Sequence, residues 1–215
     1  MNLISLEKRY SREFDASFDS FRNLYREIVK LKNVSLKERE VSKAMLIRLH
    51  SWYSFQRKIK GFLNKRRATP GSDFFVETLL FYLKAIFEIF DVKQEVHSER
   101  EIRRKKGVIR PDISIWKGND VKAIIECKTQ LGWNRYGWKE AFMKKEKGLK
   151  SEFPNAKTFL VVMTSKNWPG FGEDENIGKK FFTLYNTWPT EIDLKDNLDK
   201  YILNPIEPLI KSLAA

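Results

Sequence analysis

Apolar residues in the first part of the chain recur every three or four positions, the spacing of one face of an α-helix. One such stripe runs over 14–28 and a second over 41–59. Between them, residues 35–38 (SLKE) have the spacing of a capping box, which predicts that the second helix starts there. Residues 73–90 are apolar on almost every side, which is typical of a helix at the centre of a fold.

The hydrophobic period changes to two in the middle of the chain, as in strands with one buried face. The expected elements are strands over 92–98, 108–116, 121–130 and 158–164, a basic connection over 100–107, a three-residue turn at 118–120, helices over 138–153 and near 195–213, and a strand or helix at 179–186. This order predicts a mixed α/β protein in which a helical region, residues 1–67, packs on a core formed by residues 68–215.

Composition limits the class of protein. The chain has 215 residues, of which 42% are hydrophobic, so a sizeable core can form. A single cysteine, Cys127, argues against a disulfide framework and a multi-cysteine zinc site. The two histidines, His50 and His97, are too few for a histidine-rich metal site, and both are expected to be structural or surface residues. No apolar run is long enough to span a membrane and no secretory signal is present, so we expect a cytoplasmic protein.

The net charge points to a polyanionic partner. The chain has 41 Lys and Arg against 28 Asp and Glu, a formal charge of +13. Nucleic acid is the most common partner of such a basic, aromatic-rich chain. An anionic membrane surface and a simple solvated basic surface are the alternatives.

Two acidic residues interrupt apolar strands. Asp112 and Glu126 lie in the second and third expected strands, and Lys128 is on the same face as Glu126 because side chains alternate along a strand. Counting back from the expected turn places Asp112 opposite Glu126, at about 5 Å across the ladder. Two adjacent carboxylates repel each other unless a cation lies between them, and Mg²⁺ is a cation that binds such oxygen ligands. The alternative is a surface salt bridge between Glu126 and Lys128.

This pattern resembles the PD-(D/E)XK nuclease superfamily. The motif here reads Pro111-Asp112, thirteen intervening residues, and Glu126-Cys127-Lys128. The resemblance covers about 90 of the 215 residues. It implies a restriction-endonuclease-like core, in which a small mixed β-sheet is flanked by helices.

The resemblance also implies roles for individual residues. Asp112 and Glu126, with the backbone carbonyl of Cys127, would bind Mg²⁺, and Mn²⁺ would substitute. Lys128 would position the hydrolytic water. Glu77 has the place of a further ligand and catalytic carboxylate, although the positive end of its helix is an alternative reason for its position. On a nearly apolar helix, the only cations that the sequence suggests near Glu77 are Lys128 and the metal. The Cys127 side chain is expected to face the core and to be inert.

The expected activity is Mg²⁺-dependent hydrolysis of phosphodiester bonds in double-stranded DNA, as in a type II restriction endonuclease. Such enzymes usually act as two-fold homodimers, and residues 1–67 carry apolar stripes that a dimer interface would cover. A structure-specific repair or junction-resolving nuclease, and an inert DNA-binding protein on the same fold, are the alternatives. The candidate DNA contacts are Arg103, Arg104, Lys105, Lys106, Gln130, Lys139 and Lys144. For the lysines the alternative is a solvated helix face, and for Gln130 a polar strand end.

Overall fold

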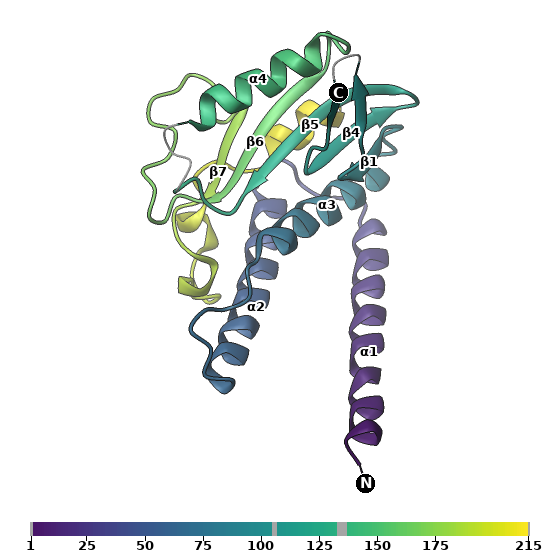
Figure 1. The fold of residues 1–215 in the computed structure, drawn as a ribbon, viewed down its shortest axis with the longest axis vertical. Helices are drawn as coiled ribbons and strands as arrows, with labels where there is room; N and C mark the ends of the chain where they lie inside the picture. The colour runs from purple at the N-terminus through teal and green to yellow at the C-terminus, as the bar shows by residue number, and fades with distance from the viewer. Residues whose placement is uncertain (1, 105–106, 133–136, 215) are drawn as a thin grey trace.

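The structure is a computed structural model that describes residues 2–104, 107–132 and 137–214 (Figure 1). Within these residues it is a mixed α/β fold, as expected from the sequence. The helices are α1 (Leu3–Val29), α2 (Glu40–Phe62), α3 (Ser72–Ile89), α4 (Trp138–Lys150) and α5 (Glu207–Ala214), and two 3₁₀ helices span Pro189–Glu191 and Leu198–Tyr201.

The main sheet has five strands in the order β1-β4-β5-β6-β7. These strands are β1 (Glu95–Ser98), β4 (Ile113–Lys117), β5 (Asp120–Lys128), β6 (Lys157–Thr164) and β7 (Phe181–Tyr185). The first three are antiparallel, and β5, β6 and β7 are parallel. Two short strands, β2 (Ile102–Arg104) and β3 (Gly107–Ile109), pair separately.

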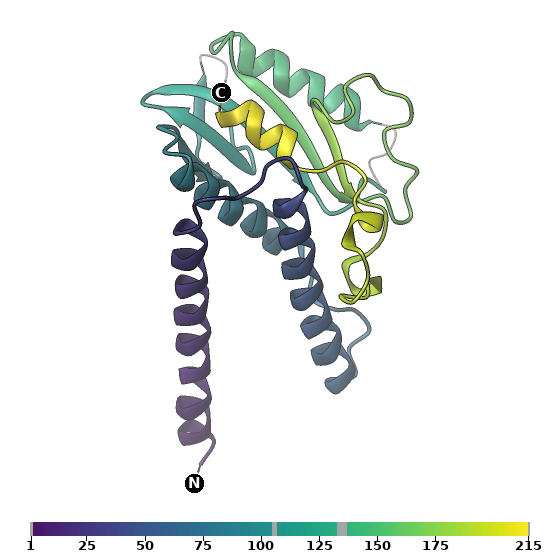
Figure 2. The same ribbon diagram turned by 180° about the vertical axis from the view of Figure 1, so that it is seen from behind.

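Different helices cover the two faces of the sheet (Figures 1 and 2). On one face, which we call the α3 face, residues of α2, α3 and α5 form the largest apolar core with alternate residues of the strands. On the other face, the α4 face, apolar residues of α4 such as Phe142 and Leu149 pack on the intervening strand residues. Helix α3 is buried along most of its length, as its sequence predicts.

Helix α1 is only half engaged with the rest of the molecule. Near its C-terminal end, Phe21 and Tyr25 pack against Phe81 of α3, with ring centroids 5.0 and 5.4 Å apart. The N-terminal half projects away from the sheet (Figures 1 and 2), and no residue of α1 is buried.

The predicted capping box at residues 35–38 is wrong. Helix α2 begins at Glu40, because Arg39 has a left-handed backbone conformation (φ 56°) that a helix cannot include. A capping box would use the side chain of Glu38, but in the structure the carboxylate of Glu40 accepts a hydrogen bond from the backbone N–H of Ser35 at 2.9 Å.

The expected strand over 108–116 is two strands. Residues of β3 pair with β2, which lies inside the expected connection over 100–107, and β4 joins the main sheet. The break falls at Pro111, which has no N–H to give to a ladder. Two of the predicted basic contacts, Lys105 and Lys106, lie outside the described residues.

The hairpin between β4 and β5 has a two-residue turn rather than the expected three-residue turn. Lys117 pairs with Asp120, and Gly118 takes the positive φ (61°) that this tight turn requires. A bulge between Ile115 and Trp116 then shifts the register. Ser114 consequently pairs with Ile124, which is the pairing that the sequence predicts further along the hairpin.

The expected helix near 195–213 is confirmed only in its last part. A 3₁₀ helix at Leu198–Tyr201 is followed by an irregular segment, and α5 begins only at Glu207. Pro205 prevents a continuous helix, and the Asn204 side chain accepts a hydrogen bond from the N–H of Thr183 in β7 at 3.0 Å.

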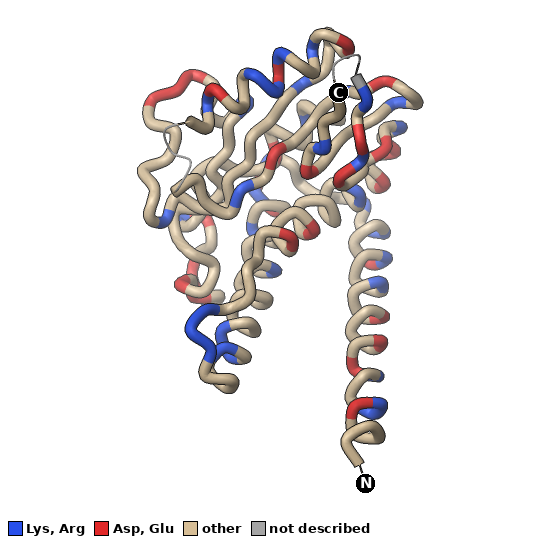
Figure 3. The backbone as a smooth tube through the Cα atoms, in the orientation of Figure 1, with Lys and Arg blue, Asp and Glu red and all other residues tan. Residues whose placement is uncertain are grey.

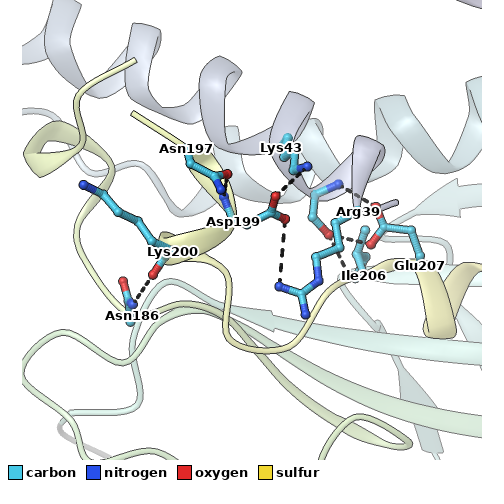
Figure 4. Close-up of polar contacts among 9 residues, drawn as sticks. Arg39, Lys43, Asn186, Asn197, Asp199, Lys200, Ile206 and Glu207 are labelled. Atoms are coloured by element: carbon cyan, nitrogen blue, oxygen red, sulfur yellow. Dashed lines mark hydrogen bonds and ion pairs between the residues drawn. The ribbon is translucent and has the colours of Figure 1, made fainter. Parts of the chain in front are cut away.

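The C-terminal segment docks on the start of α2 (Figure 4). Asp199 forms ion pairs with Lys43 at 2.9 Å and Arg39 at 3.9 Å. The buried carboxylate of Glu207 accepts hydrogen bonds from the N–H and hydroxyl of Ser42 at 2.9 and 2.6 Å. These contacts fix α5 and α2 together on the α3 face.

Candidate active site

Asp112 is held at the junction between β1 and β5. Its backbone carbonyl accepts hydrogen bonds from the N–H of Glu99 at 3.3 Å and the hydroxyl of Ser98 at 3.1 Å. Its side-chain Oδ2 accepts a hydrogen bond from the backbone N–H of Cys127 at 2.6 Å. The Asp112 carboxylate therefore lies against the end of β5, beside Cys127, which directly follows Glu126.

Glu126 is an enclosed carboxylate on the α4 face. Its side chain is 12% exposed, and its Oε1 lies 2.6 Å from Nζ of Lys145 in α4. This oxygen is shielded from solvent and makes no hydrogen bond of standard geometry within the described residues. The ion pair with Lys145 therefore compensates for the desolvation of Glu126.

Lys128 is the most exposed member of the predicted set. Its side chain is 44% exposed, and Nζ is 3.9 Å from Oδ2 of Asp112. Beside it, Glu126, Lys128 and Lys145 contribute the charged lining of a cavity of about 380 Å³. Each carboxylate of the site thus has a lysine as its partner, and the cavity gives a ligand access to three charged groups.

The donor set fits a hard divalent cation. Asp112 and Glu126 supply carboxylate oxygens, and Oε1 of Glu126 is shielded from solvent with only the Lys145 ammonium group beside it. Among the described residues, no three His, Cys, Asp or Glu side chains are grouped so as to hold a metal. Mg²⁺ usually binds through one or two carboxylates and keeps several waters, so a two-carboxylate site is compatible with it.

The structure does not bring Glu77 into such a group with Asp112 and Glu126. Glu77 is 53% exposed on α3, and its Oε1 lies 3.2 Å from Arg48 of α2. Arg48 in turn lies over the rings of Phe21, Phe74 and Phe81. The cation that the structure places beside Glu77 is Arg48 rather than Lys128.

The predicted DNA contacts are scattered. Arg103 is exposed on β2, and Lys144 is exposed on α4. Lys139 is 2.7 Å from Asp174, and this hydrogen bond is the main reason that the pKa of Asp174 falls to about 2. Gln130 donates a hydrogen bond to the backbone carbonyl of Lys166 at 2.7 Å, so it ties the end of β5 to the segment after β6.

Arg104 ends β2, and its side chain, like Lys105 and Lys106, is outside the described part of the structure. Figure 3 shows basic residues along α4, which carries two of the predicted contacts, and also in the segment that follows α2, where Lys65, Arg66 and Arg67 are adjacent. The positive charge is therefore spread over several elements.

The Cys127 side chain faces the α3 core, as predicted. It is 6% exposed and belongs to the same apolar cluster as Ile125. Burial, followed by the nearby charges of Asp112 and Glu126, raises the pKa of the thiol well above its usual value. The side chain is consequently a poor nucleophile and a poor metal ligand.

The sequence reasoning missed the particular roles of Lys145 and Arg48. A signal for Lys145 was available, because it lies three residues after Phe142 and four before Leu149, both buried on the sheet side of α4. A lysine within such an apolar stripe is directed toward the sheet, where a carboxylate can pair with it. For Arg48 the signal was weaker, since a basic residue beside apolar neighbours on a helix is common.

Comparison with models of protein families, with curated proteins and with solved structures finds no match for this chain. Among the described helices, none combines the length and apolar character that crossing a membrane requires.

Proposed function

We propose that this protein is a metal-dependent endonuclease that hydrolyses phosphodiester bonds in DNA, of the restriction-endonuclease type. The observation that supports this most directly is the position of Asp112 and Glu126 at one end of the β4–β5 hairpin, with Lys128 3.9 Å from Asp112 and lining the same cavity as Glu126. Two carboxylates at one end of a hairpin, with a lysine next to them, suit metal-assisted hydrolysis of a phosphate ester.

Each residue has a definite task in this proposal. Asp112 and Glu126 would hold Mg²⁺, with the backbone carbonyl of Cys127 as a further oxygen donor. Bound there, the cation would supply an activated water and stabilise charge on the phosphate. Lys128, which is 44% exposed, would orient the attacking water or contact a phosphate oxygen.

DNA would bind through the basic residues around the site. Lys144 lies exposed on the helix that covers Glu126, and Arg103 lies exposed on the short strand that leads toward Asp112. With the formal charge of +13, such contacts support binding to the backbone of a duplex rather than reading of its sequence.

The decisive experiment is incubation of the protein with supercoiled plasmid and Mg²⁺, beside matched reactions in EDTA and with Glu126→Gln. We expect cleavage only in the first reaction. Discrete products would support a restriction enzyme, and preference for branched or damaged substrates would support a structure-specific nuclease. Cutting in EDTA, or full activity of Glu126→Gln, would contradict the proposal, and binding without cutting would favour an inert DNA-binding protein.

A second copy of the chain is the proposed partner of α1. The apolar side chains of its projecting half are between 39% and 74% exposed: Leu3, Ile4, Leu6, Tyr10, Phe14 and Phe18. They continue the helical face that carries Phe21 onto α3. Pairing two such faces would bury roughly 600 Å² per chain, which approaches the roughly 800 Å² per partner of a standard interface.

Sedimentation tests this partner. We expect a dimer for the wild-type chain and a monomer for Phe14→Glu, which places a charge in the apolar stripe. Arg12→Glu is the control, because residue 12 is on the opposite side of the helix. A monomeric wild type, or a dimer that survives Phe14→Glu, would exclude α1 as the interface.

A further inference from the structure

The ion pair between Glu126 and Lys145 has a geometry that a bound metal would change. The two charged atoms are 2.6 Å apart, and the Glu126 side chain is only 12% exposed. A Mg²⁺ ligand lies about 2.0–2.1 Å from its ion, so the ion and the lysine would compete for the same carboxylate. Two cations at such short range repel each other strongly where water is largely excluded.

We infer that Lys145 is a displaceable counter-ion: it neutralises Glu126 in the metal-free protein, and it moves to a substrate phosphate when a divalent cation binds. This inference rests on the proposed function, since it assumes that Glu126 is a metal ligand. It makes Lys145 a positioning residue that controls access of the cation to the site.

The exposure and position of Lys145 allow its ammonium group to move within the cavity. Its side chain is 31% exposed, and it lines the same cavity as Lys128 and Glu126. A lysine has a flexible stem and three donors, so its ammonium group can turn from the carboxylate to an anion in the cavity. The anion that fits between Lys128 and Lys145 is a phosphate group of the DNA backbone.

The same arrangement couples the two ligands. A cation on Glu126 releases Lys145 for the phosphate, and a phosphate that attracts Lys145 leaves Glu126 free for the cation. Coupling of this kind is reciprocal, so each ligand raises the affinity for the other by the same factor. Metal-free protein would therefore bind DNA without its full set of contacts.

Calorimetric titration of Mg²⁺ into the DNA-free protein tests the first half of the inference. We expect Lys145→Met to bind Mg²⁺ about tenfold more tightly than wild type, within the usual range of such couplings. Lys145→Arg, which keeps the ion pair, should resemble wild type. Lys147→Met is the matched control, because Lys147 is exposed on the same helix, and its Mg²⁺ affinity should not change. Unchanged or weaker Mg²⁺ binding by Lys145→Met would overturn the inference.

Duplex binding in EDTA tests the second half without metal or cleavage. Glu126→Gln frees Lys145 and also removes a negative charge, so its duplex affinity should rise. The double variant Glu126→Gln with Lys145→Met, compared with Lys145→Met alone, measures the charge effect by itself. We expect the rise caused by Glu126→Gln to be at least threefold smaller when Lys145 is absent. Equal rises in the two backgrounds would overturn the role of Lys145 at phosphate.

Different experimental results would contradict the proposed function and this inference. If wild type, Lys145→Met and Glu126→Gln all fail to bind Mg²⁺, the metal-dependent nuclease is wrong, and the inference falls with it. If wild type binds Mg²⁺ and cuts DNA but Lys145→Met has wild-type Mg²⁺ affinity, the nuclease stands and only the counter-ion is wrong.

Discussion

The two faces of the central sheet differ in the side chains that they bury, although the same strands contribute to both. Strand β5 gives Ile125 and Cys127 to the α3 face, where they join the largest apolar core. The alternate residues Glu126 and Lys128 lie on the α4 face, and the first of these is enclosed with its charge. The α3 face is thus mainly apolar, with the buried carboxylate of Glu207, which accepts hydrogen bonds from Ser42, as an exception. The α4 face contains the charges of the candidate site.

The covering helices explain how one sheet can hold both kinds of face. Helix α3 is buried along most of its length and offers apolar contacts. Helix α4 is amphipathic, and it pairs its charges: Lys145 with Glu126, and Glu146 with Lys150 and Lys180. A carboxylate is tolerated on the α4 face because a lysine is supplied with it. We therefore expect substitutions on the α3 face to affect stability and those on the α4 face to affect activity.

The largest expected effect is on activity, from Glu126→Gln on the α4 face. Loss of a metal ligand should lower the cleavage rate on the order of a hundredfold or more, and chelation by EDTA should do the same. Thermal unfolding in EDTA should change little, because the released Lys145 can reach solvent. Plasmid cleavage and calorimetry measure the two quantities, and a large fall in stability with intact cleavage would reverse the assignment of the faces.

Leu79→Ala on the α3 face should do the opposite. Leu79 is fully buried on α3, so its truncation should destabilise the fold by about 2–5 kcal/mol, through lost contacts and a cavity. Below the unfolding transition, Mg²⁺ affinity should be that of wild type. Phe62→Ala is the control, because Phe62 is 88% exposed and should leave the denaturation midpoint almost unchanged. Equal midpoints for the two variants would contradict this account of the α3 core.

Glu77→Gln tests whether a carboxylate on α3 contributes to the site. Its ion pair with Arg48, in which the carboxylate is 53% exposed and the guanidinium group only 14%, should contribute on the order of 1 kcal/mol to stability. We expect the Mg²⁺ dependence of cleavage to stay within about twofold of wild type, the scatter expected for a residue without a catalytic contact. A tenfold or greater loss of Mg²⁺ affinity would instead make Glu77 the third ligand that the resemblance implies.

The smallest expected effect concerns Cys127. Burial raises the pKa of its thiol, so at pH 8 the reactive thiolate is scarcer than in an exposed cysteine. Iodoacetamide should therefore modify the folded protein far more slowly than protein unfolded in guanidinium chloride. Mass spectrometry gives a direct reading, since Cys127 is the only cysteine in the chain. Equally rapid modification of folded and unfolded protein would show that the α3 face is open at this position.

Local patterns in the sequence were sufficient for several parts of the structure. The period of two placed Glu126 and Lys128 on one side of β5 and the Cys127 side chain on the other, because alternation is a property of the strand itself. In the same way, the continuous apolar character of residues 73–90 was enough to identify a central helix. The pairing of Ser114 with Ile124 is as the sequence predicts, although the turn has two residues rather than three. The bulge between Ile115 and Trp116 compensates for the shorter turn.

The ion-pair partners of the carboxylates depend on contacts between different elements of the fold. Glu77 and Arg48 belong to different helices, and Glu126 and Lys145 belong to a strand and the helix after it. A helical stripe shows that a residue faces inward, but not which face of the sheet the helix will cover. That choice depends on how the connections cross the sheet, and it determined which cation each carboxylate received. The sequence by itself thus determined which residues share a face, and the tertiary structure decided their partners, because charge pairing depends on distance in space rather than along the chain.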